Sequence, residues 1–185
     1  TMNESKIYAF FEERMENKRA ICALMGNLYA ESTLNPELLQ DTYRKKLGYS
    51  SETYTQAVDN GTYTNFAKDS AGYGLAQWTY YTRKQALLDY ARSARKSIGD
   101  LEMQLAFLWE ELGTYKGLVE KLEGAKTIRE ASDLVMLEYE KPSDQSESAK
   151  TRRANFGEDY YSQFVEEEIN MAINYDKYIL STGTH

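Results

Sequence analysis

The stretch "MGNLYAESTLNP", residues 25–36, decides how this sequence folds. Met25 and Leu28 belong to an apolar run at helical spacing, so the stretch begins inside a buried helix. Glu31 and Ser32 follow that run directly, and the Asn-Pro pair ends the helix because the residue before a proline avoids helical backbone. The stretch therefore places a carboxylate where a buried helix ends at the rim of the core.

Working outward, helical periodicity dominates the chain, which holds only two prolines and almost no alternating strand pattern. The fold class predicted from this pattern is mainly α, with a long irregular loop or small hairpin at residues 60–78. The polar stretch 143–153 is expected to be exposed. Helices are predicted at 4–17, 17–31, 36–48, 50–61, 82–97, 100–113, 114–124 and 127–142, with a last one in 155–180.

Length, charge and composition narrow the possible functions of the chain. Its 185 residues suit one domain, predicted at 1–161, followed by a C-terminal helix and tail at 162–185 that packs on the domain or leads out of it. A net charge of −7 argues against nucleic acid as a partner. The roughly 20 apolar residues needed to span a bilayer occur nowhere, so we expect no membrane insertion.

The single cysteine, Cys22, and the single histidine, His185 in the tail, exclude much chemistry. A Ser-His-Asp site, a Cys-His site and a histidine-based zinc site are impossible inside the domain. Catalysis would have to rest on carboxylates, tyrosine, lysine or an oxygen-bound metal. We expect no metal and no cofactor to be required.

Glu31 differs from the other acidic residues, most of which, such as Glu110 and Glu111, fall on polar helix faces. The negative end of the helix dipole and partial burial would both favour a protonated carboxyl at Glu31. A general acid needs that form. The alternative is a surface glutamate at a frayed helix end, paired with Lys18 or Arg83.

A second cluster, "DSAGYGLAQWT" at residues 69–79, combines glycines, aromatic rings and an amide. Gly72 and Gly74 allow a backbone to approach a ligand closely, because no Cβ stands in the way. Flat rings and an amide suit a sugar chain, whose faces are apolar and whose edges are hydroxyls. The alternative is a tight turn leading into a helix, with its aromatics in the core. The rings and the amide come from Tyr73, Trp78, Tyr80, Tyr81 and Gln77.

Taken together, these motifs resemble the phage tail lysozyme family, part of the lysozyme-like superfamily with goose-type lysozymes and lytic transglycosylases. The resemblance rests on Glu31-Ser32, on the Asn-Pro turn and on Gly74-Leu75-Ala76-Gln77, and extends over roughly residues 7–161. "YEKP" at 139–142 and "RRANFGEDYY" at 152–161 also resemble the family's C-terminal part.

The resemblance implies a lysozyme-like fold and cleavage of the peptidoglycan glycan strand. The bond cut would be the β-1,4 bond between N-acetylmuramic acid and N-acetylglucosamine, with Glu31 as general acid. The cleft is expected between the end of the second helix and the loop 60–78. The residues predicted to bind substrate are Ser32, Tyr73, Gly74, Gln77, Trp78, Tyr80 and Glu140.

The sequence leaves open whether Glu31 works with a second carboxylate and which residue that would be. Hydrolytic glycosidases usually employ two, and Asp69 is predicted as the second catalytic residue, ahead of Asp59 and Glu140. Lytic transglycosylases manage with one, because the muramoyl C6 hydroxyl attacks in place of water. Asp69 could instead form a turn with its own backbone, and Glu140 could pair near Pro142.

Two other interpretations remain: a catalytically dead glycan-binding module on the same fold, and a helical tail assembly protein. The acidic charge gives no attraction to anionic cell walls, which favours a module tethered to further domains of a larger protein. The predicted location is extracellular, at the cell wall or on a virion tail.

Overall fold

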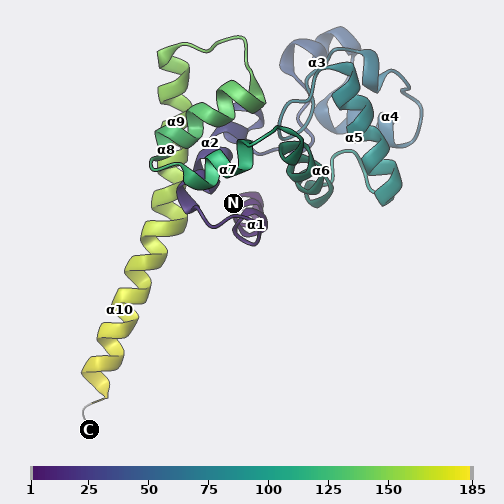
Figure 1. Cartoon of the computed structure of the whole chain (residues 1–185). Helices are drawn as coiled ribbons and strands as arrows, with labels where there is room; N and C mark the ends of the chain where they lie inside the picture. The colour runs from purple at the N-terminus through teal and green to yellow at the C-terminus, as the bar shows by residue number, and fades with distance from the viewer. Residues whose placement is uncertain (1, 184–185) are drawn as a thin grey trace.

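The computed structural model describes residues 2–183 and is mainly helical, which confirms the predicted mainly α class (Figure 1). Extended pairing within this range is limited to two isolated bridges, Leu39 with Tyr73 and Tyr73 with Trp78. These bridges hold the irregular segment 60–80 in place. The small hairpin that the sequence predicted is therefore a single tight turn between Tyr73 and Trp78. The prediction for His185 lies outside the described residues.

Helix α2 is the centre of one group of helices in Figure 1. Its residues from Ala20 to Leu28 are all buried, as the apolar pattern predicts. The side chain of Asn17 accepts hydrogen bonds from two backbone amides of the first turn and so caps the helix. The elements of this group are α1 (Met2–Glu12), α2 (Lys18–Ser32), α7 (Leu118–Gly124), α8 (Ile128–Leu134), the π-helix η2 (Val135–Glu140) and α9 (Glu147–Tyr161).

Helices α2 and α9 cross at a close contact between two glycines, Gly26 of α2 and Gly157 of α9. A Cβ on Gly26 would come within 2.5 Å of the Gly157 backbone nitrogen and 2.8 Å of the Arg153 carbonyl oxygen. A Cβ on Gly157 would come within 3.2 Å of the Ala23 Cα. The two backbones can therefore approach only because both residues lack a side chain, and this approach brings α9 to the end of α2.

The second group of helices, at the right of Figure 1, surrounds the irregular segment 60–80. Gly74 adopts a left-handed backbone with φ of +81°, and the Gln104 side chain fills the space where its Cβ would lie. The group contains α3 (Asp41–Leu47), α4 (Ser51–Asp59), the short 3₁₀-helix η1 (Phe66–Lys68), α5 (Tyr81–Ala94) and α6 (Leu101–Thr114).

Several predicted helix boundaries are wrong, two of them for reasons that the structure shows. The helix expected to start at Pro36 starts at Asp41, because Leu39 pairs with Tyr73 and so stays extended. The last helix, expected from residue 155, starts as α9 at Glu147, which Ser146 caps, while the polar segment 143–153 that contains its first turns is mostly exposed, as predicted. Its polar sequence conceals the glycine-mediated contact with α2 that buries the far end of this segment.

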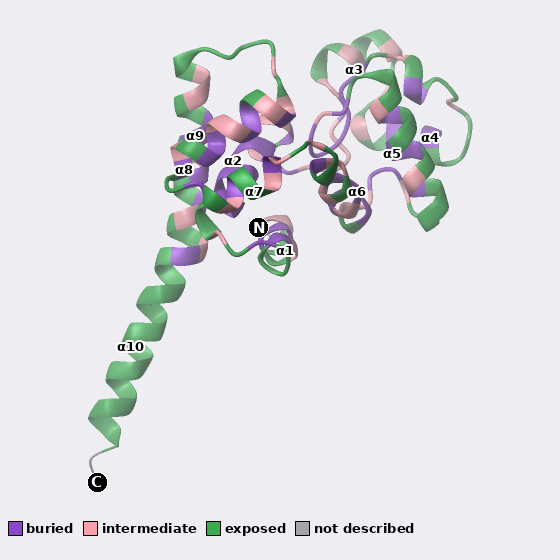
Figure 2. Cartoon of the chain, viewed as in Figure 1, coloured by how far each residue is buried: buried purple, intermediate pink, exposed green. Residues whose placement is uncertain are grey.

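Helix α10 (Glu167–Thr182) continues from α9 through the π-helix η3 (Ser162–Glu166) and projects away from the body. Figure 2 shows it exposed along its length. The division of the chain at residues 161/162 stays a prediction. Across residues 2–183 no helix combines the length and the apolar character that crossing a bilayer requires. The exposed apolar side chains of α10 are Ile169, Met171, Ile173, Tyr175, Tyr178, Ile179 and Leu180.

Candidate active site

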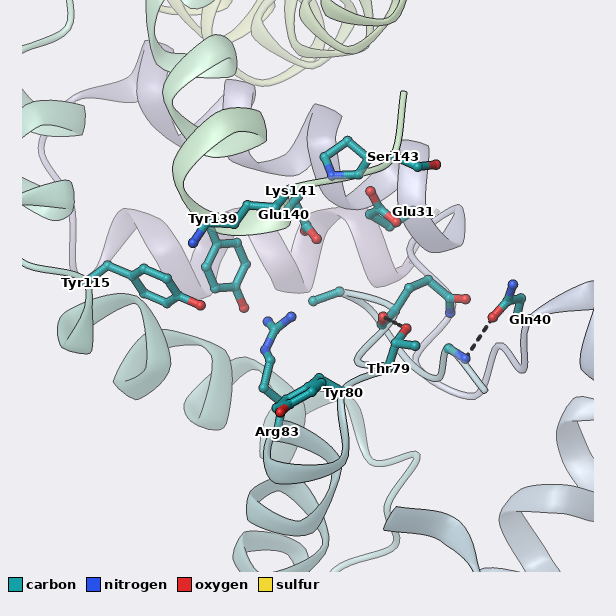
Figure 3. Close-up of a pocket in the computed structure, with 14 residues that line it drawn as sticks. Glu31, Gln40, Thr79, Tyr80, Arg83, Tyr115, Tyr139, Glu140, Lys141 and Ser143 are labelled. Carbon is teal, nitrogen blue, oxygen red and sulfur yellow. Dashed lines mark hydrogen bonds between the residues drawn. The ribbon is translucent and has the colours of Figure 1, made fainter. Parts of the chain in front are cut away.

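A cleft of about 640 Å³ lies where the end of α2, the turn 72–80 and the end of η2 meet (Figure 3). Its volume is within the range of roughly 300–1,000 Å³ that is usual for ligand sites. The cleft therefore lies where the sequence predicts, with η2 as an additional wall. The lining residues are Glu31, Gln40, Gly72, Ala76, Gln77, Thr79, Tyr80, Arg83, Tyr115, Tyr139, Glu140, Lys141, Pro142 and Ser143.

Four of the predicted site residues line this cleft: Glu31, Gln77, Tyr80 and Glu140. Tyr80 is 65% exposed at the rim, where its ring is free to meet a ligand. The Gln77 amide nitrogen donates to two backbone carbonyls and so holds the turn that forms one wall. Side chains from distant parts of the sequence thus converge on one opening.

Four other predicted substrate-binding residues lie beneath the cleft and do not line it. The Ser32 hydroxyl lies 2.8 Å from the Leu75 carbonyl oxygen and ties the end of α2 to the turn. Tyr73 and Trp78 are fully buried, and Gly74 packs on a glutamine side chain. Tyr73 and Trp78 therefore belong to the core, the alternative that the sequence left open, whereas Tyr80 and Tyr81 are exposed.

Asp69, predicted as the second catalytic carboxylate, is buried away from the cleft. Its carboxylate lies 2.6 Å from the Lys84 ammonium and also accepts hydrogen bonds from Tyr54 and Tyr63. The side chains of the ion pair are 1% and 0% exposed. The structure thus corrects the expectation that Asp69 faces the substrate, because a buried lysine holds it in the core.

Asp59, the next candidate, also lies elsewhere. It accepts hydrogen bonds from the Ser97 hydroxyl and the Ile98 amide and lines a separate hollow. Of the three carboxylates weighed as a partner for Glu31, only Glu140 reaches the same cleft.

Glu31 is ion-paired with Arg153 of α9, with Nη2 2.5 Å from Oε1. The same guanidinium donates to the buried Asn27 side chain one turn earlier on α2. The expected alternatives, Lys18 and Arg83, do not supply this partner. A charge-assisted hydrogen bond of this kind is stronger than a neutral one and fixes the position of the Glu31 carboxyl.

Glu140 lines the same cleft but its side chain forms no ion pair or hydrogen bond with any residue that the structure describes. Its Oε1 is buried and has no hydrogen-bond partner among residues 2–183. Burial and the negative charge of Glu31 raise the pKa of Glu140 well above its usual range, while Arg83 and Arg153 act in the opposite direction. The environment thus favours a neutral carboxyl, which can donate a hydrogen bond or a proton into the cleft.

The sequence did not predict the ionic cluster that lies under the cleft. Glu111, expected on a solvated face, accepts hydrogen bonds from Arg83, Trp78 and Tyr139. Burial opposes ionisation of Glu111, but Arg83 outweighs it and holds the pKa of Glu111 below its usual range. Helical spacing offered a signal, because Glu111 follows the buried Phe107 by four residues.

The π-helix η2 places Glu140 at the cleft. Lys141 follows it in a left-handed conformation, with φ of 47°, and donates its amide to the Met136 carbonyl. This ends η2 abruptly and turns the chain along the cleft edge. Short π-helical turns are frequent at functional sites.

A metal site was also considered possible from oxygen ligands. Residues 2–183 contain no group of three or more acidic, histidine or cysteine side chains arranged as metal ligands.

Comparison with known proteins identifies the family of the chain. A family model described as phage tail lysozyme matches residues 2–164. The chain belongs to the phage tail lysozyme family. The family match ends just before α10 begins at Glu167. Membership confirms the resemblance seen in the sequence, and the family's name indicates a peptidoglycan-lytic role.

A curated relative, Morphogenesis protein 1 of Bacillus phage B103, is 26% identical over 165 residues. The match covers 84% of this chain and 38% of the relative. The chain thus spans about two fifths of that relative's length. The relative's name describes a part in morphogenesis and does not specify a reaction.

Proposed function

We propose that this chain is a muramidase that binds a peptidoglycan glycan strand in the cleft and cleaves the β-1,4 bond between N-acetylmuramic acid and N-acetylglucosamine. The observation that carries the proposal is Glu31. It ends the central helix of a tail lysozyme family member, and its carboxyl lines the cleft. Glu31 is the general acid in this proposal, as the family pattern implies.

The reaction needs a proton at the bond that breaks. Glu31 protonates the glycosidic oxygen, the bond from the sugar C1 to that oxygen breaks, and positive charge develops at C1. Water then adds to C1 and gives one proton to the Glu31 carboxylate, which regenerates the acid. Because Arg153 balances the charge of Glu31, the carboxyl must gain a proton before it can donate one.

We propose further that the chain acts at a cell wall or on a virion tail, tethered to other domains. Its net charge of −7 gives no attraction to an anionic wall, and tethering supplies the local concentration instead. The longer curated relative supports such an arrangement.

Purified peptidoglycan tests the proposal. Turbidity loss and soluble fragments are measured for the wild type, for Glu31→Gln and for Glu13→Gln, an exposed glutamate just after α1 that serves as the matched control. We expect clearing by the wild type and the control, and a loss of about 10²-fold or more in Glu31→Gln. Clearing that survives in Glu31→Gln would remove Glu31 from the mechanism.

The products distinguish the reaction types. Reducing ends found by mass spectrometry support hydrolysis, whereas 1,6-anhydro ends support a lytic transglycosylase. Binding to peptidoglycan without clearing by the wild type would favour a glycan-binding module. A failure to bind or clear would favour an assembly role, in keeping with the relative's name.

A further inference from the structure

We propose that Glu140 is the second carboxyl of the catalytic site and that Glu31 and Glu140 hold a single proton between them for delivery to the glycosidic oxygen. This inference rests on the proposed muramidase function and deepens it. It assigns a role to the buried Oε1 of Glu140, which has no hydrogen-bond partner within residues 2–183.

The two carboxyls reach the cleft from elements far apart in the sequence. Glu31 comes from the last turn of α2, and Glu140 is the final residue of η2. Both line the cleft, and Figure 3 shows their side chains along the same edge of it. The charge of Glu31 acts on Glu140, so the two groups interact electrostatically.

The neighbouring cations are already committed to other carboxylates. The guanidinium of Arg153 pairs with Glu31, and that of Arg83 pairs with Glu111 at 2.6 Å. The positive charges of Arg153 and Arg83 are therefore already neutralised by Glu31 and Glu111 at the cleft floor. An ionised Glu140 would add a buried negative charge without a partner, which is costly.

The remaining polar groups at this edge do not change the balance. The Tyr139 hydroxyl donates to Glu111, and the Lys141 ammonium lies 5.6 Å from the centre of the Tyr115 ring at the cleft edge. Neither is hydrogen-bonded to Glu140 in the described structure. Glu140 therefore keeps a proton where a sugar oxygen can enter, beside the Glu31 carboxyl that is ion-paired with Arg153.

A proton shared by Glu31 and Glu140 accounts for each proton transfer in the reaction. The pair gives its proton to the glycosidic oxygen as the C1–oxygen bond breaks, and both carboxyls become ionised. The second negative charge appears when positive charge develops at C1, so it stabilises the transition state more than the substrate. Water adds as hydroxide to C1, and its remaining proton returns to the pair.

The test is the pH profile of peptidoglycan clearing by Glu140→Gln, with Glu138→Gln as the matched control. Glu138 lies on the same π-helix but pairs with Lys121 at the surface. We expect Glu140→Gln to lose about 10²-fold of the activity at pH 7. Its alkaline limb should move to lower pH, because the buried carboxyl that holds the proton is removed and the carboxyl that remains, Glu31, is ion-paired with Arg153.

A merely structural role for Glu140 would lower activity without moving the alkaline limb, and that result would overturn the proposal. So would a Glu140→Gln profile that matches the wild type and the control. A shifted limb in Glu140→Gln, with an unchanged limb in Glu138→Gln, supports a shared proton.

Carbon-13 NMR of glutamate-labelled protein tests the pair without substrate. We expect one protonated glutamate carboxyl at pH 7 in the wild type and in Glu138→Gln, and none in Glu140→Gln. Absence of that signal in the wild type overturns the proposal even if the variant does not fold. If the signal is present but peptidoglycan is not cleaved, the proposed function fails while the proton-holding pair stands.

Discussion

Replacement of Gly26 by alanine tests the helix crossing that positions the candidate active site. The added methyl group would lie 2.5 Å from the Gly157 nitrogen, 2.8 Å from the Arg153 carbonyl oxygen and 3.0 Å from the Gly157 Cα. All three are backbone atoms, so no side-chain rotation can relieve the overlap. Ordinary contact begins near 3.4 Å, so α9 must retreat by about 0.9 Å at the closest point.

The expected loss of stability follows from two opposing effects. Forcing a methyl group into a well-packed contact costs about 1–3 kcal/mol, and a backbone contact belongs to the upper part of that range. Alanine regains about 1 kcal/mol through its higher helix propensity. We therefore expect the free energy of unfolding of Gly26→Ala to fall by about 2 kcal/mol.

Gly113→Ala is the matched control, because Gly113 also lies in a helix but has no atom within 4 Å of the position of its Cβ. Helix propensity alone should leave its stability unchanged or raise it by up to about 1 kcal/mol. Urea unfolding followed by circular dichroism measures both variants. At temperatures where Gly26→Ala is folded, peptidoglycan clearing should also fall, because α9 carries the Arg153 partner of Glu31.

Equal or higher stability in Gly26→Ala than in Gly113→Ala would refute the close crossing of α2 and α9. A loss of stability without any change in peptidoglycan clearing would still support the close crossing of α2 and α9. It would also show that Glu31 tolerates a shift of its arginine partner.

Three further predictions concern buried charges. Lys84→Met should lower the free energy of unfolding by about 3–5 kcal/mol because it strands the Asp69 carboxylate in the core; wild-type stability in urea would contradict this. Glu111→Gln should lower the melting temperature by depriving Arg83 of its partner, as calorimetry can measure. Glu140→Gln should stabilise the protein increasingly above about pH 4.5. Wild-type Glu140, whose folded-state pKa is raised, loses stability as pH rises, so a melting-temperature gain at pH 4 equal to that at pH 7 would oppose this.

Local sequence features predicted the helices well, because the forces that form them act between near neighbours. The cap residues Asn17, Ser50 and Thr127 all accept hydrogen bonds from the first turn of the helix that follows them. The apolar run that ends at Glu31 placed α2 in the centre of the protein and brought its carboxyl to the cleft.

The sequence could not distinguish the carboxyls that face the cleft from those that face the core. Asp69 follows a loop and precedes a glycine turn, which is a pattern that suits a site. The ion pair with Lys84, on a neighbouring helix, holds Asp69 in the core instead. Glu140 ends a helix before a proline, which is a pattern that suits a cap. In both cases the deciding partner, or the lack of one, depends on tertiary packing.

The pairing of Glu31 with Arg153, across 122 positions of sequence, has a consequence for synthesis. A ribosome must deliver nearly the whole domain before the arginine can reach the glutamate. Chains that stop before α9 lack both the arginine and the glycine that seats it against α2. If the cleft degrades cell walls, the order of translation withholds that capacity from incomplete chains inside the cell that makes them.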